Sequence, residues 1–345
     1  MLLAMHIPDG FLGPAATIAT WGLAVGGVGY SLWRLRAALG ARLAPLIGVT
    51  SAGIFAGQMV NFPLVGLATS GHLMGGVLAA VVLGPWGAVV ALSTVLIVQC
   101  FMFGDGGVTA LGANITNMAL VGGLLGYTIY APLRRLLGGG TRGTVLAAVV
   151  ASWLIIPVAA LAFVLEFAAG GTVGIFPLAT WMVFYHVLIG LGEAIVTGLV
   201  VSWLMSTRPD LIYDPRHAVG RVGQWGQAVA AALVAAVAIA VFLAPWASEH
   251  EDGLERVADS LGFANRAEAS AWAPFPDYAL PSNNAETIEA DKSAPANSFV
   301  PHAGMVTSLM GLVGTLATFG FAVIVARTAE RRGSTLRPDA AAGVP

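Results

Sequence analysis

The amino-acid sequence predicts an all-α protein that crosses a membrane many times. Hydrophobic residues make up 57% of the 345 residues and charged residues only 10%, whereas soluble domains carry about 25% charged residues. Apolar runs of membrane-spanning length recur between Thr17 and Arg327, and a helix needs about 20 apolar residues to cross a bilayer. We therefore expect a seven-helix bundle followed by two further transmembrane helices with an extracytoplasmic loop between them.

The seven spans of the bundle are expected within a first module at residues 5–206. They are placed at Thr17–Trp33, Leu43–Leu64, Leu73–Leu83, Trp86–Phe103, Leu111–Pro132, Thr144–Phe167 and Leu178–Met205. The third and fourth are separated at Gly84-Pro85, because proline cannot continue the hydrogen-bond ladder of a helix and restricts the residue before it. A loop at residues 65–71 leads to His72.

A polar, cytoplasmic linker at residues 207–224 precedes a second module at residues 225–327. This module has spans at Trp225–Trp246 and Gly304–Ala326, with a hydrophilic outer loop at residues 248–302. In the loop, Glu255–Leu261 has helical spacing, whereas residues 274–296 are typical of an extended or disordered stretch. Residues 328–345 are expected to form a disordered cytoplasmic tail.

Four clusters of arginines orient the chain in the membrane. They are Arg34, Arg36 and Arg42; Arg134, Arg135 and Arg142; Arg208, Arg216 and Arg221; and Arg327, Arg331, Arg332 and Arg337. With the amino terminus outside and nine spans threaded in turn, all four clusters lie in the cytoplasm, as the positive-inside rule requires. The same threading places Met5, His72 and Asp105 at the outer face and the carboxyl terminus inside. We expect a multi-pass protein of the cell membrane, in contact with lipid.

Residue counts exclude several activities. Lys292 is the only lysine, so the GxxxxGK[ST] phosphate loop of an ATPase is absent. Cys100 is the only cysteine, which excludes disulfides within the chain and cysteine-based zinc sites. An intramembrane metalloenzyme would need a general base beside an open metal position, and neither HExxH nor a carboxylate pair is present. We therefore expect a protein that is not an enzyme.

The most specific chemical signal is at the beginning of the chain, in Met5-His6-Ile7-Pro8-Asp9-Gly10-Phe11-Leu12. A free amine on Met5 would lie beside the amide nitrogen and the imidazole of His6, and these three nitrogens can hold one cation in two fused chelate rings. Ni(II) and Cu(II) favour such tetragonal nitrogen geometry. A free amine on Met5 requires either translation from Met5 or removal of the four residues before it; otherwise Met5 offers an amide and the site is weakened.

His72 is the candidate for the fourth ligand. It lies in Thr69-Ser70-Gly71-His72-Leu73-Met74-Gly75-Gly76, where an outer loop becomes a helix, and small residues on both sides allow another backbone segment to approach. The alternative is a structural, hydrogen-bonded polar residue at a helix start.

These residues resemble the CbiM/NikM family, the substrate-binding membrane component of energy-coupling factor (ECF) importers for cobalt and nickel. The resemblance covers residues 5–206. It is carried by the amino-terminal run, by the His72 run, and by Gln58-Met59-Val60-Asn61-Phe62-Pro63, Phe103-Gly104-Asp105-Gly106-Gly107, Ala110-Leu111-Gly112-Ala113-Asn114, Asn117-Met118-Ala119 and His186-Val187-Leu188-Ile189-Gly190-Leu191-Gly192-Glu193-Ala194. The second module resembles the PDGLE domain, the small subunit of such importers, with Glu251 where that name has proline. That resemblance is carried by Asp252-Gly253-Leu254-Glu255-Arg256-Val257-Ala258 and Phe275-Pro276-Asp277-Tyr278.

The resemblance implies that Ni(II) or Co(II) is the transported substrate, with no organic cofactor. The metal would be held by the amine of Met5, the amide nitrogen and imidazole of His6, and the imidazole of His72. The implied partners are a transmembrane coupling subunit of the CbiQ/NikQ type and cytoplasmic ATPases of the CbiO/NikO type; no nucleic acid is implied. The PDGLE-like loop would help the metal to enter or seat, the alternative being an inert connector.

Polar residues near the candidate ligands are interpreted in two ways. Metal-bound imidazoles usually donate their other N–H to a partner, and the candidates for orienting His6 and His72 are Asn61, Ser70, Asp105, Asn114 and His186. The alternative is ordinary hydrogen bonding between helices, which we favour for Glu193, or a simple turn in the case of Asp105.

A self-sufficient secondary transporter or channel is the alternative function. It should show acidic residues through the spans for ion coupling, and only Glu166 and Glu193 are available. The sequence does not distinguish nickel from cobalt, because both ions suit the same ligands.

Overall fold

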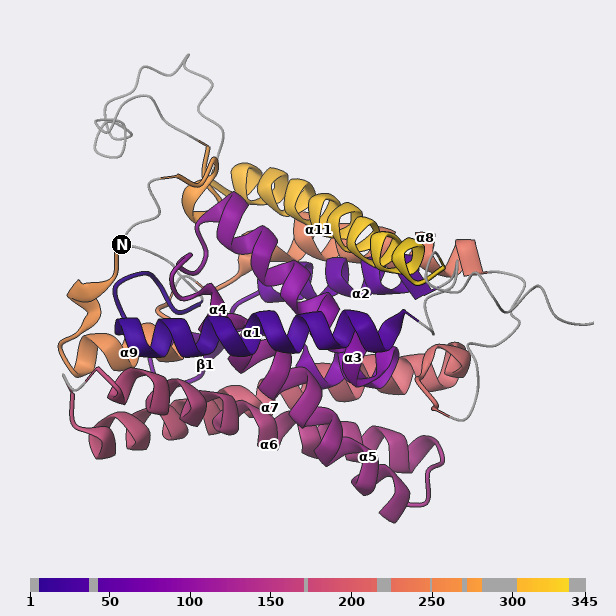
Figure 1. The fold of residues 1–345 in the computed structure, drawn as a ribbon, viewed down its shortest axis with the longest axis horizontal. Helices are drawn as coiled ribbons and strands as arrows, with labels where there is room; N and C mark the ends of the chain where they lie inside the picture. Colours follow the sequence, from indigo (N-terminus) through magenta and orange to yellow (C-terminus); the bar gives the residue numbers. More distant parts are fainter. Residues whose placement is uncertain are drawn as a thin grey trace, which may run out of the picture.

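Long apolar helices that lie side by side make up the structure, a computed structural model (Figure 1). It describes residues 6–36, 43–170, 173–215, 225–248, 250–268, 272–280 and 303–334. Six helices in these ranges are long and apolar enough to cross a membrane: Pro14–Leu35, Gly76–Phe103, Thr141–Ala168, Ile175–Thr207, Gly226–Trp246 and Gly304–Arg331. The predicted all-α, multi-pass membrane fold is confirmed, and the count of nine spans stays a prediction.

The first module contains most of the bundle. Its helices are α1 (Pro14–Leu35), α2 (Leu43–Gln58), α3 (Gly76–Val98), α4 (Leu111–Asn114), α5 (Gly126–Leu136), α6 (Thr141–Ala168) and α7 (Ile175–Thr207), with a 3-10 turn η3 (Pro209–Leu211) after α7. The π-helical turns η1 (Gln99–Phe103) and η2 (Ile115–Leu125) extend α3 and join α4 to α5. Two short strands, β1 (Phe62–Leu64) and β2 (Thr69–Gly71), pair antiparallel with Pro63 opposite Ser70.

The second module wraps one side and one end of this bundle. Helix α8 (Trp225–Ala238) continues through η4 (Ile239–Leu243) and η5 (Ala244–Trp246), and α11 (Ala303–Ser334) packs with it against α2. The outer loop contributes α9 (Gly253–Ser260) and the 3-10 turns η6 (Ala264–Arg266) and η7 (Pro276–Tyr278). In Figure 1, α9 lies at the end of the bundle where the chain begins, opposite the far end of α5.

Helix α3 occupies the centre of the bundle. Within its most apolar window 83% of the residues are buried, compared with 17% in the α8 span. Helix α3 is therefore surrounded by protein on nearly all sides, whereas most of the apolar surface of α8 is exposed. Helices α6 and α7 pack along their length against each other and present exposed apolar side chains such as Leu165, Ile195 and Leu199. An apolar exterior of this kind suits contact with lipid.

The predicted break at Gly84 is present and reverses the chain. Gly84 has φ 74° and ψ 173°, a combination open essentially to glycine alone. Ser51 on α2 donates to the carbonyl of Ala91 at 3.3 Å. Gly75 lies against Ile54, which is on the same helix and less than one turn from Ser51. A straight helix would separate Gly75 from Ala91 by about 24 Å, so the segment folds back at Gly84.

The first arm of this hairpin corrects the predicted span at Leu73–Leu83. It begins at Gly76 and rises only about 12 Å before the break, well short of the roughly 30 Å of a hydrocarbon core. His72 therefore lies in the loop just before a half-length arm, where it is partly buried.

Other boundaries also differ from the prediction. The second span ends at Gln58, not Leu64, because the following residues form β1 against β2. Helix α11 continues to Ser334, past the predicted end at Ala326, and η7 gives structure to part of the stretch predicted to be extended. The helical spacing at Glu255–Leu261 is confirmed as α9. Met5, with residues 216–224, 281–302 and 335–345, lies outside the described residues.

Two arginine-bearing segments meet at the Gly84 turn. The guanidinium of Arg34 lies over the Trp86 ring, 5.4 Å from its centroid, and the N–H of Tyr213 donates to the carbonyl of Val81 at 2.9 Å. The end of α1 and the segment after α7 thus lie at one end of the bundle, as the positive-inside threading expects.

Substituting Gly84 tests the hairpin. In Gly84→Ala the new Cβ would lie 2.8 Å from the Tyr213 ring. The alanine would also have to keep a backbone conformation that costs a non-glycine residue roughly 1–3 kcal/mol. We expect the unfolding temperature in detergent to fall by several degrees. Gly22→Ala on α1, where nothing lies within 4 Å, is the matched control; equal unfolding temperatures for both variants would contradict the assignment.

Candidate metal site

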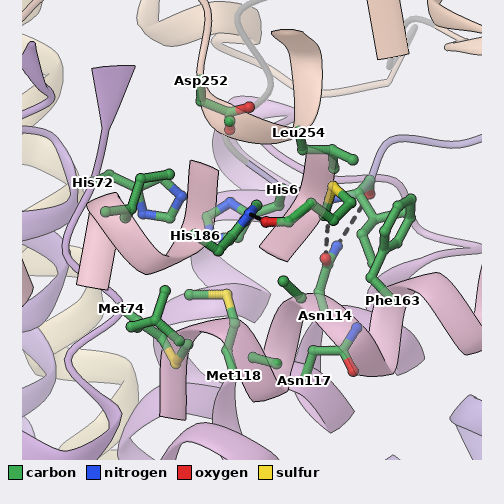
Figure 2. Close-up of a pocket in the computed structure, with 17 residues that line it drawn as sticks. His6, His72, Met74, Asn114, Asn117, Met118, Phe163, His186, Asp252 and Leu254 are labelled. Atoms are coloured by element: carbon green, nitrogen blue, oxygen red, sulfur yellow. Dashed lines mark hydrogen bonds between the residues drawn. The ribbon is translucent and has the colours of Figure 1, made fainter. Parts of the chain in front are cut away.

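A small cavity of about 110 Å³ lies between the amino-terminal segment, the β2–α3 loop, η2, α6, α7 and the start of α9. Its lining is mostly apolar but includes three imidazoles, those of His6, His72 and His186. Figure 2 shows these rings between Asp252 on one side and Met74 and Met118 on the other. Nitrogen and thioether donors with few carboxylates suit borderline and soft transition metals rather than Mg²⁺ or Ca²⁺.

His6 is buried and held by Asp105. Its Nδ1 donates to Oδ1 of Asp105 at 2.9 Å, and both side chains are 1% exposed. The hydroxyl of Tyr278, on η7 of the second module, donates to the other carboxylate oxygen at 2.8 Å. Burial raises the pKa of Asp105, but attraction to His6 and the hydrogen bonds from His6 and Tyr278 outweigh it and leave this pKa below its ordinary value. Asp105 is therefore a carboxylate at neutral pH.

The rings of His6 and His72 face each other across the cavity. Their centroids are 5.5 Å apart with 57° between the ring planes. Nδ1 of His72 lies 3.2 Å from the carbonyl oxygen of Leu73; because a carbonyl only accepts, this nitrogen carries the hydrogen and the lone pair is on Nε2. Nε2 of His6 is buried with no hydrogen-bond partner among the described residues. Two imidazole rings from distant segments therefore meet in one small space.

The extended segment that carries His6 is fixed by side-chain and backbone hydrogen bonds. Asn114 binds both polar groups of Ile7, accepting from its N–H at 3.0 Å and donating to its carbonyl at 3.1 Å. The N–H of Gly107 donates to the same carbonyl at 3.0 Å. Asp9 accepts from the N–H groups of Val108 and Thr109. The chain entering the site thus has a defined path.

The second module lines one side of the cavity with the start of α9. Asp252 and Glu255 form a capping box, in which each side chain accepts from the other's N–H, at 2.8 and 3.1 Å. Burial raises the pKa of both carboxyls. A Cβ on Gly253 would lie 2.8 Å from the Ile189 side chain and 3.3 Å from His186, so glycine allows the first turn of α9 to approach α7. The Glu251 difference from the PDGLE name does not prevent a complete helix start.

Two of the predicted orienting residues bind the second module and not the ligands. Ser70 donates from its N–H to the carbonyl of Glu251 at 2.8 Å and from its hydroxyl to the carbonyl of His250 at 2.7 Å. The carbonyl of Asn61 accepts from the N–H of Ser248 at 2.8 Å. Neither Asn61 nor Ser70 lines the cavity. Their positions show docking of the loop onto β2 and the end of α2.

Of the other predicted residues, Asn114 and His186 line the cavity, and Asp105 binds His6, which lines it. Asp105 and Asn114 contact His6 and Ile7, as described above. His186 lines the cavity from α7 and donates from Nδ1 to the carbonyl of Met182 at 2.7 Å, which places its lone pair on Nε2. No group of three or more His, Cys, Asp and Glu side chains that could hold a metal is found in the part of the chain that the structure describes.

Glu193 has a contact that the sequence interpretation did not anticipate. This fully buried α7 residue accepts from the N–H of Met74 at 2.7 Å and from that of Gly75 at 2.9 Å. The carboxylate thereby binds the unpaired backbone donors before α3 begins and fixes the loop that holds His72. No local pattern signals this contact, because it joins positions far apart in the sequence.

Comparison with known families matches both modules. A family model described as "Cobalt uptake substrate-specific transmembrane region" (CbiM) matches residues 6–211, and one described as "PDGLE domain" matches residues 226–331.

Individual relatives support the same grouping. One relative is a protein of Archaeoglobus fulgidus with the provisional name fused nickel transport protein NikMN. The chain is 36% identical to it, and the alignment covers 94% of this chain and all of that protein. It is 35% identical over 80% of its length to the fused nickel transport protein NikMN of Rhodobacter capsulatus, covering 88% of that protein. A crystal structure of a transition metal transporter aligns with 58% of this chain and 92% of its own, at a TM-score of 0.52 and 32% identity.

The contact between Glu193 and the His72 loop is testable with Glu193→Gln. The amide would turn one acceptor into a donor facing a backbone N–H, and a hydrogen bond to a charged group is worth about 1.5–3 kcal/mol. We expect the Kd for Ni(II), measured by calorimetry on the purified chain, to rise about tenfold. Glu166→Gln on α6, whose carboxylate accepts from Asn117 at 2.8 Å, is the matched control, and equal affinities in the two variants would count against the role.

Proposed function

Because this chain belongs to the CbiM family of cobalt and nickel transport proteins, with a fused PDGLE domain, we propose that it is the substrate-specificity component of an energy-coupling factor importer. The proposal is that it captures Ni(II) or Co(II) from outside the cell and delivers it inward. The observation that carries it is the meeting of the His6 and His72 rings in a buried cavity, 5.5 Å apart, at the end of the bundle where the chain begins (Figure 1).

The proposed ligands are the Met5 amine, the amide nitrogen and imidazole of His6, and the imidazole of His72. A chelate that uses the amide and the ring of one histidine must use Nδ1, because Nε2 lies on the far side of the ring. In the structure Nδ1 of His6 donates to Asp105. Metal binding therefore exchanges this hydrogen bond for a metal bond, and Nδ1 gives up its proton, which leaves Nε2 as the protonated nitrogen of the ring.

Transport also needs an energy source and partners. The sequence has no ATP-binding loop, so the proposed partners are a membrane coupling subunit and a pair of cytoplasmic ATPases. The proposed orientation puts the amino terminus outside and the Gly84 turn, with Arg34 beside it, at the cytoplasmic face. The position of α9 supports a loop that helps the metal to seat, because the first residues of this helix line the cavity together with the imidazoles.

The alternative of a self-sufficient, ion-coupled transporter has less support. Glu166 accepts a hydrogen bond from the side chain of Asn117, and Glu193 binds the two backbone N–H groups before α3. Both acidic residues of the spans are therefore engaged in fixed contacts, and neither faces a partner basic residue in these contacts.

His72→Ala is the direct test of the ligand set. Without the fourth nitrogen we expect tight Ni(II) binding to be lost, as measured by calorimetry on the full chain in detergent. His250→Ala removes an exposed imidazole of the outer loop while its backbone contact to Ser70 remains, and this control should bind normally. Undiminished binding by His72→Ala would exclude the proposed site.

The affinity should also rise with pH. Binding must displace the proton of the terminal amine, whose pKa is about 7.7–8.0, and that of the His6 amide, so metal uptake releases protons. At pH values below 7.5, we expect the Kd for Ni(II) to fall about tenfold or more for each unit by which the pH rises. A titration series from pH 6 to pH 8 in buffers that do not bind nickel measures this slope, and a flat profile would argue against an amine ligand.

A further inference from the structure

The second module reaches the surroundings of His6 at a second place besides α9, through the turn η7. The ring of Tyr278 stacks on Phe103, with centroids 4.4 Å apart and 16° between the planes. The N–H of Phe275 donates to the carbonyl of Met102 at 3.0 Å. Asp277 and Tyr278 have φ of 53° and 56°, a conformation that such residues keep only where surrounding contacts hold them. The turn is thus shaped to present one hydroxyl to the first module.

That hydroxyl completes a chain of hydrogen bonds that ends at the candidate ligand. Tyr278 donates to Oδ2 of Asp105 at 2.8 Å, and Nδ1 of His6 donates to Oδ1 at 2.9 Å. The three residues come from the outer loop, from the loop after η1, and from the amino-terminal segment. The chain therefore joins the PDGLE domain to the atom that must change its partner when metal binds.

We propose that Tyr278 is a positioning residue of the metal site. It holds the Asp105 carboxylate in place while Nδ1 of His6 passes from Asp105 to the metal. This inference rests on the proposed function, because only an Nδ1 chelate requires the exchange. The proposed metal ligands all come from the first module, so the ligand set alone gives the PDGLE domain no contact with the metal.

The hydrogen bonds that Asp105 accepts before and after metal binding determine how the loss of the Tyr278 hydroxyl changes the metal affinity. Asp105 is buried, and a buried carboxyl group is destabilised when it loses a hydrogen-bond donor. On metal binding His6 withdraws its donor, while the Tyr278 donor remains. Removing the hydroxyl therefore penalises the loaded state more than the metal-free state, and metal affinity decreases.

Tyr278→Phe in the full chain is the test, because it removes the hydroxyl and keeps the ring that stacks on Phe103. We expect the Kd for Ni(II), measured by calorimetry in detergent, to rise roughly tenfold. Tyr30→Phe on α1, a partly exposed residue far from the cavity that packs on Trp86, is the matched control and should bind like the parent. Parental affinity in Tyr278→Phe would overturn the inference.

A double-mutant cycle separates positioning from a general structural role. In an Asp105→Ala background the Tyr278→Phe change should have no further effect on the Kd, because the carboxylate through which it acts is gone. A second tenfold loss in that background would show that Tyr278 acts elsewhere and would overturn the inference. If Asp105→Ala does not fold, Asp105→Asn serves instead, and the Tyr278→Phe effect should shrink to less than about threefold.

Two further measurements distinguish this inference from the proposed function. If the parent does not bind Ni(II), or if His72→Ala binds as well as the parent, the proposed function fails. If both of those results are as expected and Tyr278→Phe is unchanged, only the role of Tyr278 fails.

Discussion

An extended strand can enter an apolar helical bundle only if its backbone polar groups are hydrogen-bonded, because the surroundings offer no water to satisfy them. The amino-terminal segment meets this constraint through Asn114, which binds both the N–H and the carbonyl of Ile7, and through Gly107, which donates to the same carbonyl. The position of His6 beside His72 depends on these bonds. The metal site proposed here is therefore a consequence of how the bundle accepts the beginning of its own chain.

Both modules contribute residues to the surroundings of this site. The first module supplies His72 from the β2–α3 loop, and His186 and Glu193 from α7; the Glu193 carboxyl group ties the His72 loop to α7. The outer loop of the second module pairs its backbone with Ser70, lines the cavity with the start of α9, and contacts Asp105 through Tyr278. The PDGLE domain is thus part of the surroundings of the site and not only a tether between two membrane helices.

Much of this arrangement could be predicted from the sequence, and the part that could not has a physical reason. Apolar runs predicted the long helices, and Gly84-Pro85 predicted the reversal of α3, because those signals are local. Asp105 and Asn114 were candidates for orienting the imidazoles because they are polar residues near them; Asp105 does bind His6, whereas Asn114 binds the backbone of Ile7. The roles of Glu193 and Tyr278 depend on contacts between distant segments, and Tyr278 lies in a polar stretch that is typical of disorder. The short β1–β2 pair was missed because Phe62 and Leu64 continue the apolar pattern of the helix before them.

The proposed metal site depends most directly on the first residue of the mature chain, since the chelate needs a free amine on Met5. Amino-terminal sequencing of the protein isolated from membranes, followed by Ni(II) calorimetry on the same sample, measures the first residue and the nickel affinity together. We expect that the chain begins at Met5 and binds nickel tightly, and that a sample with an acetylated amine does not. A protein that retains Met1-Leu2-Leu3-Ala4 and still binds nickel tightly would contradict the proposed chelate.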